Sequence, residues 1–161
     1  MNRRIAIVLA AGKGTRMKSE LPKVLIEVCD RPMIEYVLDA LEKAGVDEVL
    51  VVVGYRADLV RQRLAHRQKV RFIDQTEQLG TGHAVMMCRE ALAGHQGPVL
   101  VVTGDSPLAQ PDSLSRLLVE FGRRRPACLL GNAHKDNPQG LGRIVRDAAC
   151  SPTEMRWRWA A

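Results

Sequence analysis

Two glycines, three lysines and an arginine follow the first apolar segment of the chain, within LAAGKGTRMKSELPK (residues 9–23). Glycine lets backbone N–H groups approach an anion closely, and an arginine guanidinium suits bidentate contact with a phosphate. This combination predicts a phosphate-binding loop. A glycine turn beside solvated cations would use the same residues, and the segment alone does not decide between the two. The residues concerned are Gly12, Lys13, Gly14, Thr15, Arg16 and Lys23.

The loop fits neither of two common phosphate motifs. A dinucleotide fingerprint, G-x-G-x-x-G, would need a third glycine where Met17 stands, and an acidic residue after the second strand, where Gly54 and Tyr55 stand. A Walker A loop would need lysine and then serine or threonine directly after Gly14, which is followed by Thr15 and arginine. The segment therefore predicts a looser cradle built from backbone amides and cations.

The elements that position this loop alternate between short apolar runs and helical patterns. This rhythm predicts an α/β fold, a Rossmann-like three-layer sandwich with a mainly parallel sheet and helices on both sides. In such folds ligands lie at the carboxyl ends of the strands, so the loops after the strands should converge there. We expect strands at 5–9, 49–53, 70–73, 99–102, 127–130 and 143–145, and helices at 32–44, 57–65, 81–92 and 111–121.

Length and composition restrict the class of protein. The 161 residues, 46% hydrophobic and 26% charged, allow one domain with a real core. No apolar stretch reaches the roughly 18 residues that cross a bilayer, and the first apolar run stops at Gly12 without a cleavage site. We therefore expect a cytoplasmic protein with no membrane partner. The four cysteines form no CxxC pair, which argues against a zinc site and favours buried free thiols.

The net charge of +6 would suit either nucleic acid or a phosphorylated small molecule. The densest basic run, Arg123–Arg125, follows a helical pattern and is typical of a solvated helix end. Aromatic residues make up only 4% of the chain and none lies among these arginines, so a base-stacking surface is poorly supported. We expect no nucleic-acid partner.

Four blocks, in order over about residues 4–147, resemble the sugar-nucleotide pyrophosphorylases, and among them the N-terminal domain of bifunctional N-acetylglucosamine-1-phosphate uridylyltransferases. The resemblance implies the nucleotide-diphospho-sugar transferase fold and a partial nucleotidyltransferase domain over residues 1–147. The blocks are LAAGKGTRMKSELPK at 9–23, QTEQLGTGHA at 75–84, VVTGDSPL at 101–108 and NPQGLGRIVRD at 137–147.

The resemblance also implies roles at matching positions. Backbone groups of the first block would hold the nucleotide, two cations would act in catalysis, and the second block would read uracil. Strand-end residues would contact ribose or sugar, and one aspartate would hold Mg²⁺. The nucleotide-binding positions are Leu9, Ala10, Ala11, Gly12, Gly14, Thr15, Lys23, Gln75, Gly80 and Thr81; the catalytic positions are Arg16 and Lys23; the substrate positions are Thr103, Gly104 and Gly142; the metal position is Asp105.

The implied reaction is the Mg²⁺-dependent transfer of a uridylyl group from UTP to N-acetylglucosamine 1-phosphate. It gives pyrophosphate and UDP-N-acetylglucosamine, a cell-wall precursor. The attacking phosphate oxygen is already ionised, so cations and alignment can suffice without a general base. Two alternatives stay open: a non-catalytic nucleotide-binding fragment, and a sister enzyme using another nucleotide or sugar phosphate. The EQLGTGHA segment favours uridine over the guanylyl and thymidylyl sisters.

The resemblance stops near Asp147. The family's sugar-binding glutamate and its second metal-ligating asparagine have no match, so we expect little or no transfer activity. The segment at 148–161, which carries both tryptophans, is expected to be a divergent and disordered tail. Asp105 taken alone would suit a turn cap, and His83 is expected to be a satisfied helix histidine without a role. The sequence makes no prediction of oligomeric state.

Overall fold

The computed structural model describes residues 3–14, 17, 19–132, 136–137, 139, 143–145 and 156–158. The chain divides into two compact units, Met1–Leu129 and Leu130–Ala161. The domain boundary expected at residue 147 stays a prediction. The larger unit contains the parallel sheet and its helices, and the smaller one contains a pair of antiparallel strands.

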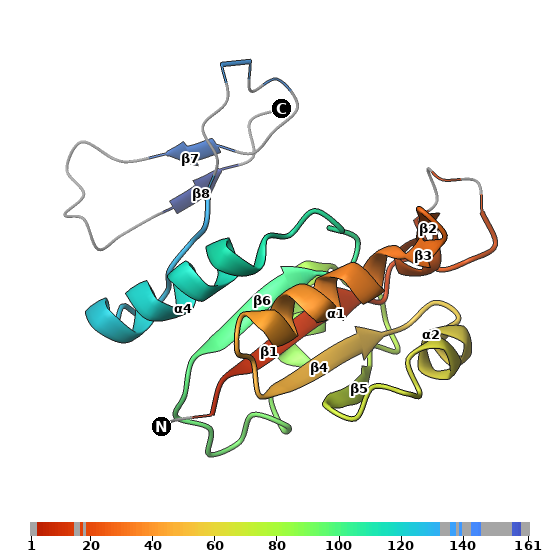
Figure 1. The fold of residues 1–161 in the computed structure, drawn as a ribbon, viewed down its shortest axis with the longest axis horizontal. Coiled ribbons are helices and arrows are strands. Elements are labelled where there is room, and N and C mark those ends of the chain that lie inside the picture. Colours follow the sequence, from red (N-terminus) through yellow and green to blue (C-terminus); the bar gives the residue numbers. More distant parts are fainter. Residues whose placement is uncertain are drawn as a thin grey trace. The chain divides into compact units, whose positions relative to one another are not determined.

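The larger unit is built on a four-stranded parallel sheet (Figure 1). Its strands lie in the order β5 (Val70–Asp74), β4 (Glu48–Val53), β1 (Ile5–Ala10) and β6 (Val99–Thr103). Because β1 pairs in parallel with both β4 and β6, their carboxyl ends meet at one edge of the sheet. The expected mainly parallel sheet is confirmed.

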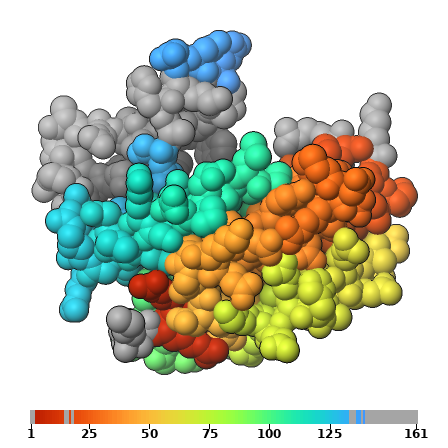
Figure 2. All heavy atoms as spheres, viewed as in Figure 1, coloured from red at the N-terminus to blue at the C-terminus, as the bar shows by residue number. Residues whose placement is uncertain are grey.

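Helices cover both faces of this sheet, which makes three layers. α1 (Met33–Lys43), α2 (Ala57–Arg63) and α4 (Pro111–Arg124) contribute to one buried cluster. α3 (Thr81–Met86) contributes to the cluster on the opposite face. Figure 2 shows α1, in orange, beside α4, in teal, on the first of these faces.

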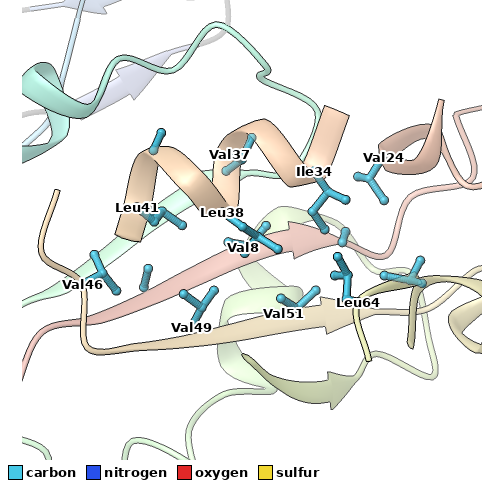
Figure 3. Close-up of a cluster of buried hydrophobic side chains, with 14 of the residues drawn as sticks. Val8, Val24, Ile34, Val37, Leu38, Leu41, Val46, Val49, Val51 and Leu64 are labelled. Atoms are coloured by element: carbon cyan, nitrogen blue, oxygen red, sulfur yellow. The ribbon is translucent and has the colours of Figure 1, made fainter. Parts of the chain in front are cut away.

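The core follows from the alternation of side chains along buried strands and the helical spacing of apolar residues. In β1, Ala6 and Val8 point into the cluster with α1, whereas Ile5 and Ile7 point into the cluster with α3. Figure 3 shows the first cluster, in which apolar side chains of α1 meet those of β1 and β4. The labelled α1 residues are Ile34, Val37, Leu38 and Leu41.

Shorter elements complete the chain. Lys23–Leu25 forms a 3₁₀ turn, η2, and an antiparallel hairpin follows, with β2 (Glu27–Val28) and β3 (Arg31–Pro32). In the smaller unit β7 (Arg143–Val145) pairs antiparallel with β8 (Arg156–Arg158), so three residues of the segment expected to be a tail form a strand. No helix in the described parts of the chain is long and apolar enough to cross a membrane.

Several predicted elements differ in the structure. The expected strand at 127–130 has no regular structure. The helix expected at 81–92 ends at Met86, because the following turns use mostly i→i−3 hydrogen bonds, such as Arg89 N–H to the Met86 carbonyl. The apolar run of β6 is typical of a buried strand, but β6 is only partly buried: Leu100 and Val102 pack against the core, whereas Val99 and Val101 are exposed. Burial is confirmed for one cysteine thiol only, Cys88; Cys29 and Cys128 are exposed, and Cys150 lies outside the described residues.

A buried charge cluster fixes α1 against the connection between α2 and β5. The Glu35 side chain is only 6% exposed and forms ion pairs with Arg67 and, at 3.8 Å, with Arg31. Arg67 also donates to Asp39 over 2.7 Å. Burial opposes ionisation of Asp39, but hydrogen bonds from Arg67 and Arg31 outweigh it and lower the pKa of this carboxyl. This cluster holds the segment that leads into β5.

We predict that Arg67→Leu lowers the free energy of unfolding by about 2–4 kcal/mol, because it leaves the buried Glu35 carboxylate without its main partner. Urea denaturation measures this change. Arg63→Leu, on the exposed side of α2, is the matched control and should change the value by less than about 0.5 kcal/mol. Equal effects of the two substitutions would contradict the role given to Arg67.

Candidate functional site

A pocket of about 320 Å³ lies where the carboxyl ends of β1, β5 and β6 meet. Its lining comes from the ends of these strands and the loops that follow them, together with η2 and α3. The predicted site residues that line it are Leu9, Ala11, Gly12, Lys23, Gln75, Gly80, Thr81, Thr103 and Asp105, and the other lining residues are Val24, Gln78 and Ala84.

The glycine loop forms one wall of this pocket. Gly12 is exposed, and a Cβ atom there would meet nothing within 4 Å. Gly14 has φ +67°, and a Cβ atom there would lie 2.7 Å from the Cβ of Lys23, so the loop requires glycine at this position. The amine of Lys13 points elsewhere, 5.2 Å from the ring centroid of Tyr55.

Lys23 and Asp105 form an ion pair in the pocket. η2 holds Lys23, and the loop after β6 holds Asp105. Burial opposes ionisation of Asp105, but hydrogen bonds from Lys23 and Thr103 and the attraction of the Lys23 charge outweigh it. The pKa of this carboxyl therefore lies below its ordinary value. Asp105 stays ionised, and Lys23 stays near it rather than in solvent.

The loop after β5 forms another part of the pocket wall. Gln75 is only 5% exposed, and its N–H donates to the Val53 carbonyl over 2.8 Å. Gly80 has φ +98°, a conformation that suits glycine. Gln78 donates from Nε2 to the Ala11 carbonyl over 3.0 Å, which joins this wall to the glycine loop.

The remaining predicted residues lie in different places. Ala10 is buried in the core and does not line the pocket. Gly104 is also buried, and its N–H donates to the Leu9 carbonyl over 2.9 Å. Thr103 exchanges a hydrogen bond with Ser106 over 2.7 Å. Thr15, Arg16 and Gly142 lie outside the described residues.

Sequence reasoning missed two polar residues here. Gln78 lies in the same block as Gln75, three residues further along the chain, and the sequence assigned it no role. This spacing could have indicated that Gln78 lies near the same site. His83 was expected to be a satisfied helix histidine without a role. Its Nδ1 atom lies 3.0 Å from the Nε2 atom of Gln75, a contact that satisfies this nitrogen and also connects His83 to the pocket wall. Val24 and Ala84 also line the pocket. Apolar lining residues cannot be told from core residues in a sequence.

Comparison with known proteins identifies the family of this chain. The family model of the MobA-like NTP transferase domain matches residues 6–153. The chain belongs to this family. The sequence resemblance to nucleotidyltransferases is thereby confirmed.

Curated relatives of this MobA-like NTP transferase chain include the bifunctional protein GlmU. The protein from Enterococcus faecalis is 45% identical over 147 residues, which cover 91% of this chain and 32% of that protein. The protein from Geotalea daltonii is 44% identical over 150 residues, 93% of this chain and 33% of that protein. The chain thus spans about one third of the length of these relatives.

Solved structures show the same fold, that of the nucleotide-diphospho-sugar transferases. A nucleotidyl transferase from Methanothermobacter superposes with a TM-score of 0.64 at 29% identity, covering 74% of this chain and 58% of that chain. A UDP-glucose pyrophosphorylase from Acinetobacter gives a TM-score of 0.60 at 23% identity, covering 78% and 54%. The second likeness concerns the fold alone.

The donor set of this MobA-like pocket restricts how a metal ion could be held. The described residues contain no group of three or more acidic, histidine or cysteine side chains that could hold a metal. Mg²⁺, however, is commonly bound by one or two carboxylates together with phosphate oxygens and water. The ionised Asp105 carboxylate in the pocket fits that mode, provided that a phosphate supplies further ligands.

We predict that Lys23→Met lowers the free energy of unfolding at pH 7 by up to about 1 kcal/mol, since the pair is partly exposed. Because the pKa of Asp105 is depressed in the folded chain, the pair stabilises the fold above the ordinary value of 3.8. This contribution is lost as the pH falls through the folded-state pKa. Urea denaturation at pH 7 and at a pH well below 3.8 measures the free energy of unfolding of the variant and the parent. The two values should converge at the acidic pH.

The control for this measurement is Lys43→Met, because Lys43 is exposed in the last turn of α1. Its difference from the parent should not follow the titration of Asp105. A Lys23→Met difference that persists unchanged in acid would show that lost packing, rather than the ion pair, caused it.

Proposed function

We propose that this chain binds UTP in the pocket at the sheet edge and transfers its uridylyl group to a sugar 1-phosphate, N-acetylglucosamine 1-phosphate. The observation that carries the proposal is that a single pocket is lined both by a cation and an acid and by polar residues of the loop after β5. Lys23 and Asp105 are the cation and the acid. Gln75, Gly80 and Thr81 lie in this loop and at the start of α3.

The likeness to GlmU supports uridine and N-acetylglucosamine 1-phosphate over other substrates of the family. Gln75, Gly80 and Thr81 belong to the block in which the resemblance implies a uracil-reading loop, and all three line the pocket. Gly12 leaves open space for a close approach of phosphate to backbone. A uridine nucleotide would therefore have its base at the loop after β5 and its phosphates at the glycine loop.

The chemistry requires alignment and charge neutralisation rather than a base. An oxygen of the sugar phosphate bonds to the α-phosphorus of UTP, the bond from that phosphorus to the bridging oxygen breaks, and pyrophosphate leaves. No proton needs to move, because the attacking oxygen is already ionised. Lys23 and Arg16 would neutralise the charge on the triphosphate and on the leaving group.

Asp105 would hold Mg²⁺ together with the phosphates, and the ion would stabilise negative charge during transfer. Lys23 would then leave Asp105 and contact phosphate instead, which its long side chain allows. Thr103, Gly104 and Gly142 would lie toward the ribose or the sugar. For the buried Gly104, only backbone groups are available for such a contact.

We predict that UTP with Mg²⁺ raises the thermal midpoint of the chain by several degrees. Ligand at 100 times Kd contributes about 2.7 kcal/mol, and about 2–4 °C accompanies each kcal/mol at this size. Differential scanning fluorimetry measures the shift against ATP, GTP and CTP. Lys23→Met should weaken UTP binding about tenfold by removing a charged phosphate contact, with Lys43→Met as the matched control. Equal protection by all four nucleotides would refute uracil reading.

We also predict that pyrophosphate release from UTP and N-acetylglucosamine 1-phosphate is slow. Asp105 is the one acidic residue among the described lining residues. A metal ion would therefore take most of its ligands from the substrates and from water, and it would be held weakly. Asp105→Asn should abolish the release, whereas Asp112→Asn, exposed on α4, should not. A coupled pyrophosphate assay measures both. Rapid turnover that survives Asp105→Asn would contradict the assignment, and tight UTP binding without any release would identify a non-catalytic nucleotide-binding chain.

A further inference from the structure

The side chain of Gln75 lies in the pocket wall with one end already engaged. The residue follows β5 directly, and its backbone N–H is held by the Val53 carbonyl over 2.8 Å. With only 5% of its surface exposed, the side chain has little freedom to leave the wall. What it offers to a ligand therefore depends on which end of the amide faces the pocket.

Two neighbours determine the orientation of this amide. Nε2 of Gln75 donates to the Gly80 carbonyl over 3.3 Å, and a carbonyl can only accept. The same Nε2 lies 3.0 Å from Nδ1 of His83. A neutral imidazole has one donor and one acceptor nitrogen, so Nδ1 must be the acceptor and the proton must be on Nε2. Both hydrogens of the Gln75 amide are then used inside the protein.

The free end of the Gln75 side chain is consequently Oε1, a pure acceptor. The described residues donate no hydrogen bond to it. Uracil carries an N3–H donor on the edge where cytosine carries an N3 acceptor. An acceptor in the wall favours the first base, whereas a reversed amide would present its NH₂ group and favour the second.

We propose that His83 is a positioning residue that fixes the Gln75 amide and thereby sets the preference of the pocket for a base with an imide N–H over cytosine. This inference rests on the proposed binding of UTP, and it assigns the cause of base selection to a residue outside the phosphate site. The bond to Gly80 is the longer of the two contacts, so His83 contributes most of the restraint on the amide. His83 itself does not line the pocket.

The first experiment compares UTP and CTP affinities, with Mg²⁺ present, by isothermal titration calorimetry. His83→Leu removes the acceptor, and His83→Asn restores one, because Asn Oδ1 can accept from Gln75. We expect His83→Leu to lower the ratio of UTP to CTP affinity about fivefold or more, in line with the loss of one hydrogen bond. His83→Asn should recover most of the ratio, which a purely structural role would not predict.

An unchanged ratio of UTP to CTP affinity in His83→Leu, or an equal loss of affinity for both nucleotides without recovery in His83→Asn, would overturn the inference. Neither outcome would contradict UTP binding by the parent chain. A parent chain that binds no nucleotide would instead defeat the proposed function. The tautomer supplies a measurement that needs no ligand: long-range ¹H–¹⁵N NMR should show His83 protonated on Nε2 and bare on Nδ1. A proton on Nδ1 would overturn the inference by itself.

Discussion

The parallel pairing of β1 between β4 and β6 is the constraint on which the rest of the molecule depends. β1 is buried on both faces, and its two neighbours fix its register along its whole length. Parallel pairing brings the ends of these strands to one edge, and the loops that leave them therefore face one another. Without this register Gly12, Gln75 and Asp105, which are far apart in the sequence, would not share a pocket.

The charged groups that line the pocket form an ion pair rather than a basic surface patch. Although the chain carries a net charge of +6, the Lys23 cation in the pocket is matched by Asp105. Burial opposes ionisation of Asp105, but hydrogen bonds from Lys23 and Thr103 and the nearby Lys23 charge outweigh it and lower the pKa of this carboxyl. The partly buried pocket therefore contains a matched pair of charges rather than an isolated one, which lowers the cost of burying them.

The sequence predicted the parallel strands and the loops at their ends because buried β-branched runs and strand-end glycines leave strong signals. Prediction from the sequence failed where the local structure or a side-chain contact depends on a segment that is distant in the sequence. The apolar run at 127–130 reads as a strand, but in the structure it has no partner strand. The contact between His83 and Gln75 depends on how a short helix is placed against β5. The roles given to Thr15, Arg16 and Gly142 still rest on the family resemblance.

The carbonyl of Ala11 accepts two hydrogen bonds, from the Tyr55 N–H over 3.1 Å and from Gln78 Nε2 over 3.0 Å. One oxygen thereby ties the loop after β1 to the loops after β4 and β5. The entropy of arranging these three segments is lost when the chain folds, and little of it remains to be lost when a ligand arrives. The entropy cost of binding would therefore fall mainly on the ligand, through its lost translational, rotational and conformational freedom, and fewer contacts would be needed to reach a given affinity.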